Sequence, residues 1–581
     1  MAAPTAILGA LKPAVDAALA DLAQRDAVRR IWAGDADLWR PGDAAAATSI
    51  TNRLGWLQSP AWAQQQAAGL AAFATAARAD GFTDAVLLGM GGSSLAPEVL
   101  RRTLGVAPGH LDLHVLDTTD PASILAVERR LDLRHTLFIV SSKSGTTVET
   151  VSQQRYFWGR LQALGLAPGR QFVAVTDAGT ALERLGASEG FRNVFVNPGD
   201  IGGRYSALSY FGMAPAALLG AGLPGFLGAA EAMADACRRT PAGDDNPGRW
   251  LGAIIATAAL QGRDKLTLVC SPALATFGYW AEQLLAESTG KLGKGVLPVE
   301  GEPLGPVAAY GNDRLFVCLG LASERDAATE GRLAALGTAG HPVVFITLDA
   351  VSDLGAEFFR WEFATAITGV LLGINPFDEP NVQESKDNTG AVLAALPANP
   401  TVGDLPEPVA VVTGDGIAVA GDASGPTPLT AMAAFLNQVR PGDYLALMAY
   451  LPNDAPTNAA LLRLRTALRT IMHVATTVGF GPRFLHSTGQ FHKGGPATGV
   501  YLQFTCDDPE DMPVPGQPFS FGVLKRAQAL GDLQSLQKHG RRALRLHLSG
   551  GPTERLAALD RLTAALVAGR SGHEPPASPE A

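Results

Sequence analysis

Short apolar runs that alternate with helix-like stretches constrain the fold of this chain more than any other feature. The first such runs span residues 85–88, 111–116, 136–140 and 172–175. Each is followed by a polar or glycine-containing turn and then by a helical pattern. Short strands separated by helices predict βαβ units, and therefore a parallel sheet with helices on its faces.

The same alternation returns twice further along the chain. The later runs span 266–269, 315–319, 343–348, 444–449, 500–504 and 544–548. The first three predict a second α/β domain, and the last three predict a further α/β segment. Between the two sets lies a proline-rich linker, 397–408, followed by Gly414-Asp415-Gly416 between the apolar stretches 409–412 and 417–419. Such a turn between two apolar stretches predicts a β-hairpin.

The expected fold class is therefore α/β, with two doubly wound parallel-sheet domains and an additional C-terminal α/β segment. The alanine-rich start of the chain is helical in pattern, and its first 22 residues predict an amphipathic helix. The proline-containing end predicts a disordered tail. The predicted limits are 1–80 for the helical segment, 81–235 and 236–395 for the two domains, 396–570 for the C-terminal segment and 571–581 for the tail.

Composition narrows the class of protein. Of 581 residues, 47% are hydrophobic and 17% are charged, which excludes wholesale disorder and allows a large buried core. The formal net charge of −9 disfavours general binding to nucleic acid or to an anionic membrane. The four cysteines are far apart, which fits a reducing compartment without disulfides or a zinc site. We expect neither a signal peptide nor a membrane span.

A hydroxyl-rich loop, 141–150, lies where the third predicted strand meets a helix. A helix N-terminus offers unpaired N–H groups and the positive end of the helix dipole, which together favour an anion. The hydroxyls of Ser142, Ser144 and Thr147 add donors, Lys143 adds positive charge, and glycine 145 permits a tight turn. The loop thus predicts a phosphate site. The alternative is an ordinary helix cap in a polar loop.

A glycine-rich turn, Gly89-Met90-Gly91-Gly92-Ser93-Ser94, follows the first predicted strand. A dinucleotide-binding GxGxxG turn would need glycine at position 94, where serine stands. A tight strand-to-helix turn is the structural alternative. Next to the hydroxyl-rich loop, Gly92 and Ser93 favour a cradle for a sugar phosphate.

The order of these motifs resembles the sugar-isomerase (SIS) domain, and more closely the glucose-6-phosphate isomerase family. The motifs of that family appear here at 89–93, 142–150, 202–206, 283–291 and Lys386. The spacing and the segment after 395 resemble the isomerase half of fused transaldolase–glucose-6-phosphate isomerase proteins, although we expect no transaldolase barrel before the first strand. The resemblance implies two SIS domains with the active site between them, a sugar-phosphate substrate, no metal or nucleotide cofactor, a homodimer and a cytoplasmic location.

The resemblance also assigns chemistry to residues. Aldose–ketose isomerisation moves a proton between C1 and C2 through an enediolate, and Glu287 is the expected base. Gln283 lies four residues earlier, on the same helix face, where it can hold the sugar. Arg204 is the expected enediolate stabiliser, and Lys386 is expected to assist ring opening. The alternatives are a surface acid for Glu287, a salt bridge to Glu149 for Arg204 and a solvated helix lysine for Lys386.

One departure from the family concerns its catalytic histidine, which stands between the base helix and the late lysine. In that interval this chain has only His341, in a turn before a strand. Two further histidines, His486 and His492, lie in a glycine-bearing loop. Either is a candidate, because imidazole titrates near neutral pH, and the spacing does not decide between them. A polar surface loop is the alternative.

Two rival functions share these motifs. A dual phosphoglucose/phosphomannose isomerase would use the same base and phosphate loop. A non-catalytic SIS protein that regulates a partner would need the phosphate loop but not Glu287, Arg204 and Lys386 together. A third rival, an NAD-linked oxidoreductase, is disfavoured by Ser94.

Overall fold

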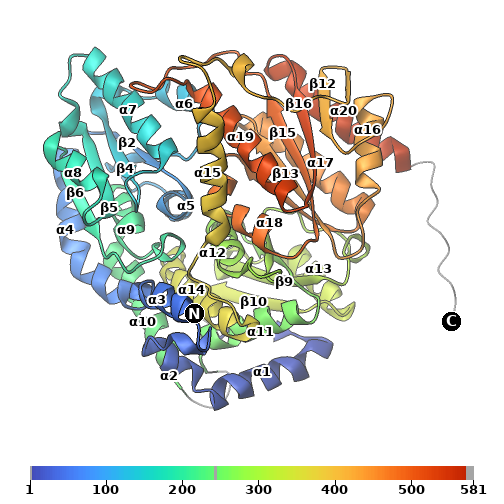
Figure 1. Cartoon of the computed structure of the whole chain (residues 1–581). Coiled ribbons are helices and arrows are strands. Elements are labelled where there is room, and N and C mark those ends of the chain that lie inside the picture. Colours follow the sequence, from blue (N-terminus) through green and yellow to red (C-terminus); the bar gives the residue numbers. More distant parts are fainter. Residues whose placement is uncertain (1–2, 241–244, 571–581) are drawn as a thin grey trace.

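Three β-sheets with helices on their faces organise the chain in the computed structural model, which describes residues 3–240 and 245–570 (Figure 1). All three sheets have parallel cores, and each arises from one of the three sets of apolar runs. The predicted α/β fold class is confirmed. The domain limits remain a prediction, and the predicted tail, 571–581, lies outside the described residues.

The first sheet is entirely parallel and has the order β3-β2-β4-β5-β6. Its strands are β2 (Asp84–Gly89), β3 (Asp112–Leu116), β4 (Thr136–Ser141), β5 (Phe172–Asp177) and β6 (Asn193–Asn197). Strands β2 and β4 are almost wholly buried, as expected for a parallel sheet covered on both faces. Their carboxyl ends carry the glycine-rich turn and the hydroxyl-rich loop, so the sheet places the two motifs side by side.

The second sheet has the order β1-β10-β9-β7-β8. Its strands are β1 (Thr5–Ile7), β7 (Lys265–Cys270), β8 (Leu297–Val299), β9 (Arg314–Leu321) and β10 (Val343–Leu348). Strand β1 pairs antiparallel with the open edge of β10, which corrects the prediction of a helix over the first 22 residues. The amphipathic helix starts only at Lys12, with a proline in its first turn.

The third sheet has the order β11-β12-β16-β15-β13-β14. Its strands are β11 (Val412–Gly414), β12 (Ile417–Gly421), β13 (Tyr444–Tyr450), β14 (Ala475–Phe480), β15 (Gly499–Cys506) and β16 (Arg542–Leu548). The predicted hairpin is confirmed as β11–β12, and positive φ angles at Asp415 and Gly416 close its turn. The four strands that the apolar runs did not predict are β1, β6, β8 and β14. They are short or rich in polar residues, so only pairing with their neighbours defines them.

Helices cover the faces of all three sheets. Those of the first half are α1 (Lys12–Gln24), α2 (Ala27–Trp32), α3 (Ala44–Thr51), α4 (Ser59–Ala79), α5 (Leu95–Leu104), α6 (Pro121–Glu128), α7 (Val148–Ala163), α8 (Ala181–Ser188), α9 (Tyr210–Leu218), α10 (Leu223–Arg238), α11 (Pro247–Leu260) and α12 (Phe277–Thr289). Those of the second half are α13 (Ala327–Thr338), α14 (Leu354–Leu372), α15 (Pro380–Ala394), α16 (Pro428–Leu436), α17 (Ala455–Met472), α18 (Gly489–Gly494), α19 (Phe521–Lys538) and α20 (Pro552–Arg570).

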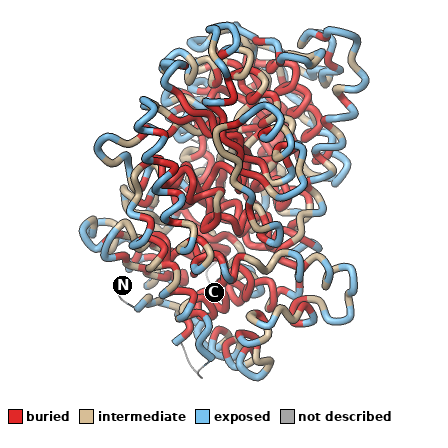
Figure 2. Tube along the Cα trace, turned by 90° about the vertical axis from the view of Figure 1, so that its left-hand side faces the viewer, coloured by how far each residue is buried: buried red, intermediate tan, exposed pale blue. Residues whose placement is uncertain are grey.

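Helix α15 runs between the first and third sheets and packs against α19, with the second sheet below it in Figure 1. The largest core cluster joins the first two sheets to helices α1–α5, α9–α12 and α14, and Figure 2 shows how continuous the buried interior is. Its widest side chains include the fully buried Trp39, Trp56, Trp280 and Trp361. Burial of such aromatic side chains holds the two sheets in a fixed relation. No helix in the described part is long and apolar enough to cross a membrane.

Candidate active site

The hydroxyl-rich loop connects the carboxyl end of β4 to the first turn of α7. Its hydroxyls form two pairs, with 3.0 Å between Ser142 Oγ and Thr147 Oγ1 and 3.1 Å between Ser144 Oγ and Thr146 Oγ1. Gly145 has a φ of 69°, which lets its N–H turn back to Ser142 Oγ at 3.1 Å. Among the described residues, the Thr147 side chain caps no N–H of α7. The first N–H groups of α7 are therefore free to bind an anion.

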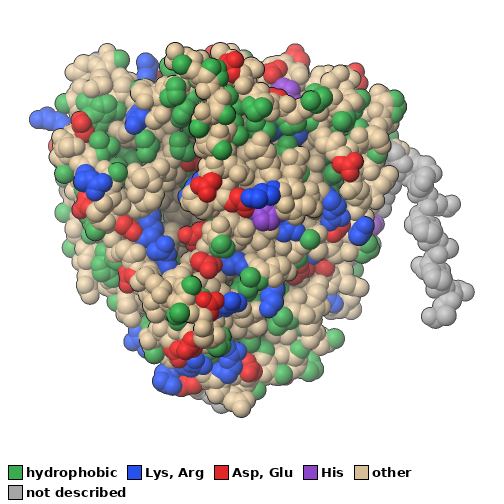
Figure 3. Space-filling view, in the orientation of Figure 1, with side chains coloured by type: hydrophobic (Ala, Val, Ile, Leu, Met, Phe, Trp, Pro, Cys, Tyr) green, Lys and Arg blue, Asp and Glu red, His purple; other side chains and the backbone are tan. Residues whose placement is uncertain are grey.

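A cavity of about 400 Å³ opens in front of this loop. It lies between the start of α7, helix α15, the end of the 3₁₀ segment η13 (Arg483–His486) and helix α19. Its polar lining consists of Ser144, Thr146, Thr147, Glu149, Gln383, Ser385, Lys386, Thr389, His486 and Gln528. The face drawn in Figure 3 is hollowed between the first sheet and α15. The structure therefore brings the phosphate loop, Lys386 and His486 to one cavity.

A chain of hydrogen bonds between residues of the first and third sheet regions holds His486 in place. Its Nε2 lies 2.9 Å from Glu149 Oε1, which also accepts a hydrogen bond of 2.7 Å from Gln528 Nε2. Gln528 Oε1 in turn accepts from Thr119 Oγ1 at 2.7 Å. Burial alone would raise the pKa of Glu149, but the charge and hydrogen bond of His486, with Lys386 nearby, bring that pKa below its usual value. The hydrogen bond to Glu149 fixes the orientation of the imidazole.

The glycine-rich turn permits three loops to meet. A Cβ atom on Gly92 would lie 2.0 Å from the carbonyl oxygen of Gly203, and one on Gly91 would lie 2.7 Å from that of His486. Ser93 is buried, and its carbonyl oxygen accepts a hydrogen bond of 3.1 Å from Ser141 Oγ. In this structure Gly92 and Ser93 lie outside the cavity lining, where they bring the segments around Arg204 and His486 close to the phosphate loop.

The expected base lies on α12 within a buried polar cluster. Glu287 is 7% exposed, and its Oε2 accepts a hydrogen bond of 3.0 Å from Gln283 Nε2. Gln283 Nε2 also donates to the carbonyl oxygen of His486 at 2.8 Å, so it links the base helix to the histidine segment. Burial raises the pKa of the Glu287 carboxyl, although the Arg204 charge opposes that shift. A buried carboxylate with raised basicity suits proton abstraction.

Arg204 is buried, and all three nitrogens of its guanidinium donate hydrogen bonds. Nη1 donates to Glu287 Oε1 at 3.0 Å and to Glu379 Oε2 at 2.9 Å, and Nη2 donates to two backbone carbonyls. Nε donates to Ser288 Oγ at 2.8 Å. The alternative of a salt bridge to Glu149 is wrong, because the carboxylate partners of Arg204 are Glu287 and Glu379. The observed geometry makes Arg204 a group that positions the carboxylate of Glu287.

Comparisons with known proteins point in the same direction as the geometry. The sequence model of the family described as phosphoglucose isomerase matches residues 71–296. A glucose-6-phosphate isomerase of Rubrobacter xylanophilus is 30% identical over 405 residues, which cover 60% of this chain and 91% of that relative. The chain belongs to the phosphoglucose isomerase family. A glucose-6-phosphate isomerase of Cyanothece sp. is 30% identical over 356 residues, which cover 54% of this chain and 66% of that relative. The chain thus spans just under two thirds of the length of that relative.

Two solved structures resemble the fold of this member of the phosphoglucose isomerase family. A hypothetical protein from Thermus thermophilus matches with a TM-score of 0.57 and 25% identity, over 68% of this chain and 100% of that chain. A glucose-6-phosphate isomerase from Chlamydia trachomatis matches with a TM-score of 0.53 and 20% identity, over 65% of this chain and 86% of that chain. The second likeness shows the fold alone.

Two more of the predicted site residues have side chains that are engaged away from the cavity. The first is Lys143, which forms an ion pair with Asp177 at the end of β5 and donates to the carbonyl oxygen of Gly199 at 3.0 Å. Its charge is therefore already paired, which corrects the expectation that its ammonium faces the phosphate site. A positive charge at the cavity comes instead from Lys386, an exposed residue of α15.

His492 is the other residue that the structure places elsewhere. It lies in α18, is 2% exposed, and packs between the rings of Tyr444, Phe484 and Tyr501. Neither ring nitrogen has a hydrogen-bond partner within the described part. Burial holds the pKa of the imidazole well below its usual value, so the ring is neutral. The candidacy of His492 is corrected, because its ring is enclosed by aromatic side chains and does not reach the cavity.

Several residues of the site were not predicted from the sequence. Glu149 stands inside the phosphate-loop motif, and an acidic residue in the first turn of a helix was the readable signal there. Glu379 precedes α15, and Gln528 and Thr119 come from segments with no motif of their own. Lys291 ends the base motif and donates to Asn375 O at 2.6 Å. Burial lowers the pKa of Lys291 to about 8, and Arg204 contributes to that shift.

The dinucleotide alternative meets a structural obstacle. Asp117 follows β3, where a dinucleotide-binding protein would present its ribose carboxylate. Here both oxygens of Asp117 accept hydrogen bonds from Arg483, at 2.5 Å and 2.9 Å. A paired, buried carboxylate is not available to a ribose hydroxyl, so the geometry disfavours an NAD-linked oxidoreductase.

Proposed function

We propose that this chain interconverts glucose 6-phosphate and fructose 6-phosphate by proton transfer through an enediolate. The observation that carries the proposal is the convergence of three features: the phosphate loop and the His486–Glu149 pair at one cavity, and the Glu287 cluster, which Gln283 links to the His486 segment. The two curated relatives cited above are named glucose-6-phosphate isomerase, which supports the same substrate pair.

The phosphate end of the substrate belongs in the 400 Å³ cavity, where Ser144, Thr147 and the first N–H groups of α7 donate hydrogen bonds. Lys386 supplies a positive charge at the opposite wall. Charge-assisted hydrogen bonds to a phosphate are stronger than neutral ones and fix its orientation. Binding energy at the phosphate then positions the sugar carbons for reaction.

Glu287 acts as the base that takes the proton from C2 and returns it to C1. Gln283 and Arg204 each hold one carboxylate oxygen, so the base is oriented before substrate arrives. For Arg204 to stabilise the enediolate as well, an oxyanion must replace one of its partners. Glu379 is the accessible one, because its side chain is 38% exposed.

His486 opens the sugar ring. Its imidazole faces the cavity, and its hydrogen bond to the carboxylate of Glu149 holds the ring in place. A protonated imidazole can donate to the ring oxygen and take a proton back after isomerisation. Lys386, on the neighbouring wall, assists by its charge.

The substrate proposal is tested by coupled assays on the purified protein. Glucose 6-phosphate should be converted to fructose 6-phosphate. A substitution that slows this conversion should also slow the reverse reaction. Mannose 6-phosphate, supplied alone, distinguishes a dual phosphoglucose/phosphomannose isomerase. A protein that binds 6-phosphogluconate but converts none of these sugars would instead be a non-catalytic SIS regulator.

The double substitution Ser144→Ala with Thr147→Ala is expected to raise KM for fructose 6-phosphate by at least one order of magnitude. Each lost charge-assisted hydrogen bond costs roughly 1.5–3 kcal/mol of binding. Steady-state kinetics measures this effect. Thr329→Ala, on the unrelated helix α13, is the matched control. An unchanged KM in the double variant would place the phosphate elsewhere.

His486→Ala is expected to reduce turnover of cyclic fructose 6-phosphate by about 10²–10⁴-fold, the usual range for a general acid–base group. Turnover of a substrate that cannot close a ring, erythrose 4-phosphate, should fall much less, because its C4 hydroxyl is esterified and ring opening is then not needed. The ratio of the two rates is the measurement. His492→Ala serves as the comparison, since it disturbs the aromatic packing but should leave the ratio unchanged. Equal losses on both substrates in His486→Ala would remove the ring-opening role.

Three further proposals rest on the resemblance. We place the protein in the cytoplasm, as a homodimer that acts in glycolysis or gluconeogenesis. Fractionation and sedimentation analysis test the first two. The likeness of residues 30–395 and of the following segment to the isomerase half of transaldolase–glucose-6-phosphate isomerase fusions is supported only by motif spacing.

A further inference from the structure

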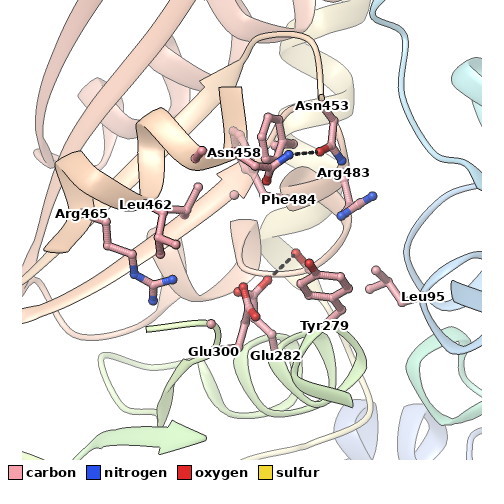
Figure 4. Close-up of a pocket in the computed structure, with 16 residues that line it drawn as sticks. Leu95, Tyr279, Glu282, Glu300, Asn453, Asn458, Leu462, Arg465, Arg483 and Phe484 are labelled. Atoms are coloured by element: carbon pink, nitrogen blue, oxygen red, sulfur yellow. Dashed lines mark hydrogen bonds between the residues drawn. The ribbon is translucent and has the colours of Figure 1, made fainter. Parts of the chain in front are cut away.

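A second cavity, of about 240 Å³, lies where parts of all three sheet regions meet (Figure 4). Its walls come from α5, α12, the turn after β8, helix α17, the end of β14 and η13. None of its lining residues lines the first cavity. The two are neighbours through η13, because His486 faces the first cavity while Arg483, Phe484 and Ser487 face the second.

Two carboxyl groups point into this cavity from its lower wall in Figure 4. Glu282 and Glu300 are each 9% exposed. Among the described residues, Glu300 makes no hydrogen bond, and Glu282 accepts only a long one, 3.4 Å from Ser487 Oγ. Burial, together with the neighbouring Glu300, raises the pKa of Glu282 to about 8. Buried carboxyl groups without partners are costly, so each needs a compensating ligand or proton.

Two guanidinium groups approach the carboxyls from other walls. Arg465 donates from Nε and Nη2 to Thr476, and Arg483 donates from Nε and Nη2 to Asp117. Within the described part, Nη1 of each arginine has no hydrogen-bond partner. The cavity therefore offers acceptors on one side and unused donors on the others, and the side-chain amides of Asn453 and Asn458 add both kinds at its rim.

This mixture of charges selects the chemistry of the occupant. An ammonium group or metal ion would be repelled by the two arginines, and a phosphate would be repelled by the ionised form of Glu282 or Glu300. An uncharged hydroxyl can donate to a carboxylate and accept from a guanidinium at the same time. The ring of Tyr279 and the side chains of Leu95 and Leu462 supply apolar surface for carbon atoms. The volume lies below the roughly 300–1,000 Å³ of pockets for drug-sized ligands.

We propose that the cavity at Glu282 and Glu300 is a second binding site, for a small uncharged polyhydroxylated molecule of monosaccharide size. The site goes beyond the proposed isomerase reaction, because it has no phosphate-binding loop and is separate from Glu287. Its wall includes Ser487, the residue after His486, so an occupant contacts the segment that holds the ring-opening histidine.

The test is a titration of the purified protein with unphosphorylated fructose and glucose by calorimetry. The protein is first saturated with 6-phosphogluconate, so that the first cavity is filled. We expect saturable binding of at least one hexose. Glu300→Leu and Ala459→Trp should each weaken that binding by about tenfold or more, the first by removing an acceptor and the second by filling the cavity. Glu362→Leu, which replaces another buried glutamate without a partner, is the matched control and should bind as the parent does.

Absence of hexose binding to the inhibitor-loaded parent protein would overturn the proposal. Unchanged hexose affinity in Ala459→Trp would also overturn it. Residue 459 is exposed, so this variant remains informative if Glu300→Leu does not fold. Binding of inorganic phosphate or ammonium at this cavity in place of a hexose would also overturn it. Isomerase assays of Ala459→Trp separate the two proposals, because normal turnover with lost hexose binding leaves the catalytic site intact.

Discussion

Replacing Glu287 by glutamine is expected to lower kcat by about 10²–10⁴-fold, which is the usual contribution of a general base. Glutamine keeps the size of the side chain and can still accept a hydrogen bond from Arg204, but its amide cannot take the carbon-bound proton. Binding of 6-phosphogluconate should therefore persist. The measurements are steady-state turnover of fructose 6-phosphate and exchange of the C2 proton in deuterated water.

A matched control exists on α14. Glu362 is fully buried, its carboxyl oxygens have no partner among the described residues, and burial raises its pKa well above the usual value, so it carries a proton. Glu362→Gln thus exchanges one neutral group for another and should keep turnover near that of the parent. Near-normal isomerisation in Glu287→Gln would assign the base elsewhere. In the parent protein, turnover should fall as the pH drops through the raised pKa of Glu287, because the protonated carboxyl is no longer a base.

Arg204→Met is expected to lower the free energy of unfolding by about 3–5 kcal/mol, the cost of leaving buried charges without their partner. The substitution removes five donated hydrogen bonds and leaves Glu287 and Glu379 without the guanidinium that bridges them. Chemical denaturation followed by fluorescence measures the change. Isomerase activity should fall as well, because Glu287 loses the group that orients it.

The comparison for this prediction is Arg325→Met, which removes an exposed arginine paired with Glu330. An exposed pair contributes little, so its denaturation midpoint should stay near that of the parent. Arg204→Lys keeps the positive charge but loses the planar guanidinium with its several donors. It should therefore be more stable than Arg204→Met and less stable than the parent. A denaturation midpoint unchanged in Arg204→Met would mean that the buried cluster reorganises around water.

The geometry also explains why the third sheet matters to a site built on the first two. The family's usual histidine interval contains only His341 here, and His341 is buried beside Phe316 in the second sheet. The η13 segment that follows β14 brings His486 to the phosphate loop instead, and α19 brings Gln528 to Glu149. Residues 396–570 therefore contribute directly to the candidate site within the same chain.

The family resemblance identified the candidate base, whereas the sequence alone determined the fold class and the candidate phosphate loop. These follow from local signals, because a buried parallel strand needs a continuous apolar run and a phosphate loop needs hydroxyls and glycine at a helix start. The same reasoning missed β1, β6, β8 and β14, which are short or contain polar residues and lie at the edges of their sheets.

Only the tertiary structure decided between His486 and His492, which are six residues apart in one loop. Local sequence gives both the same chemistry, but the chain turns so that one ring meets Glu149 and the other enters an aromatic cage. The pairing of Lys143 with Asp177, and of Arg204 with Glu379, likewise joins residues far apart in the sequence. Charge partners and burial depend on which distant elements pack together, and no local pattern encodes that choice.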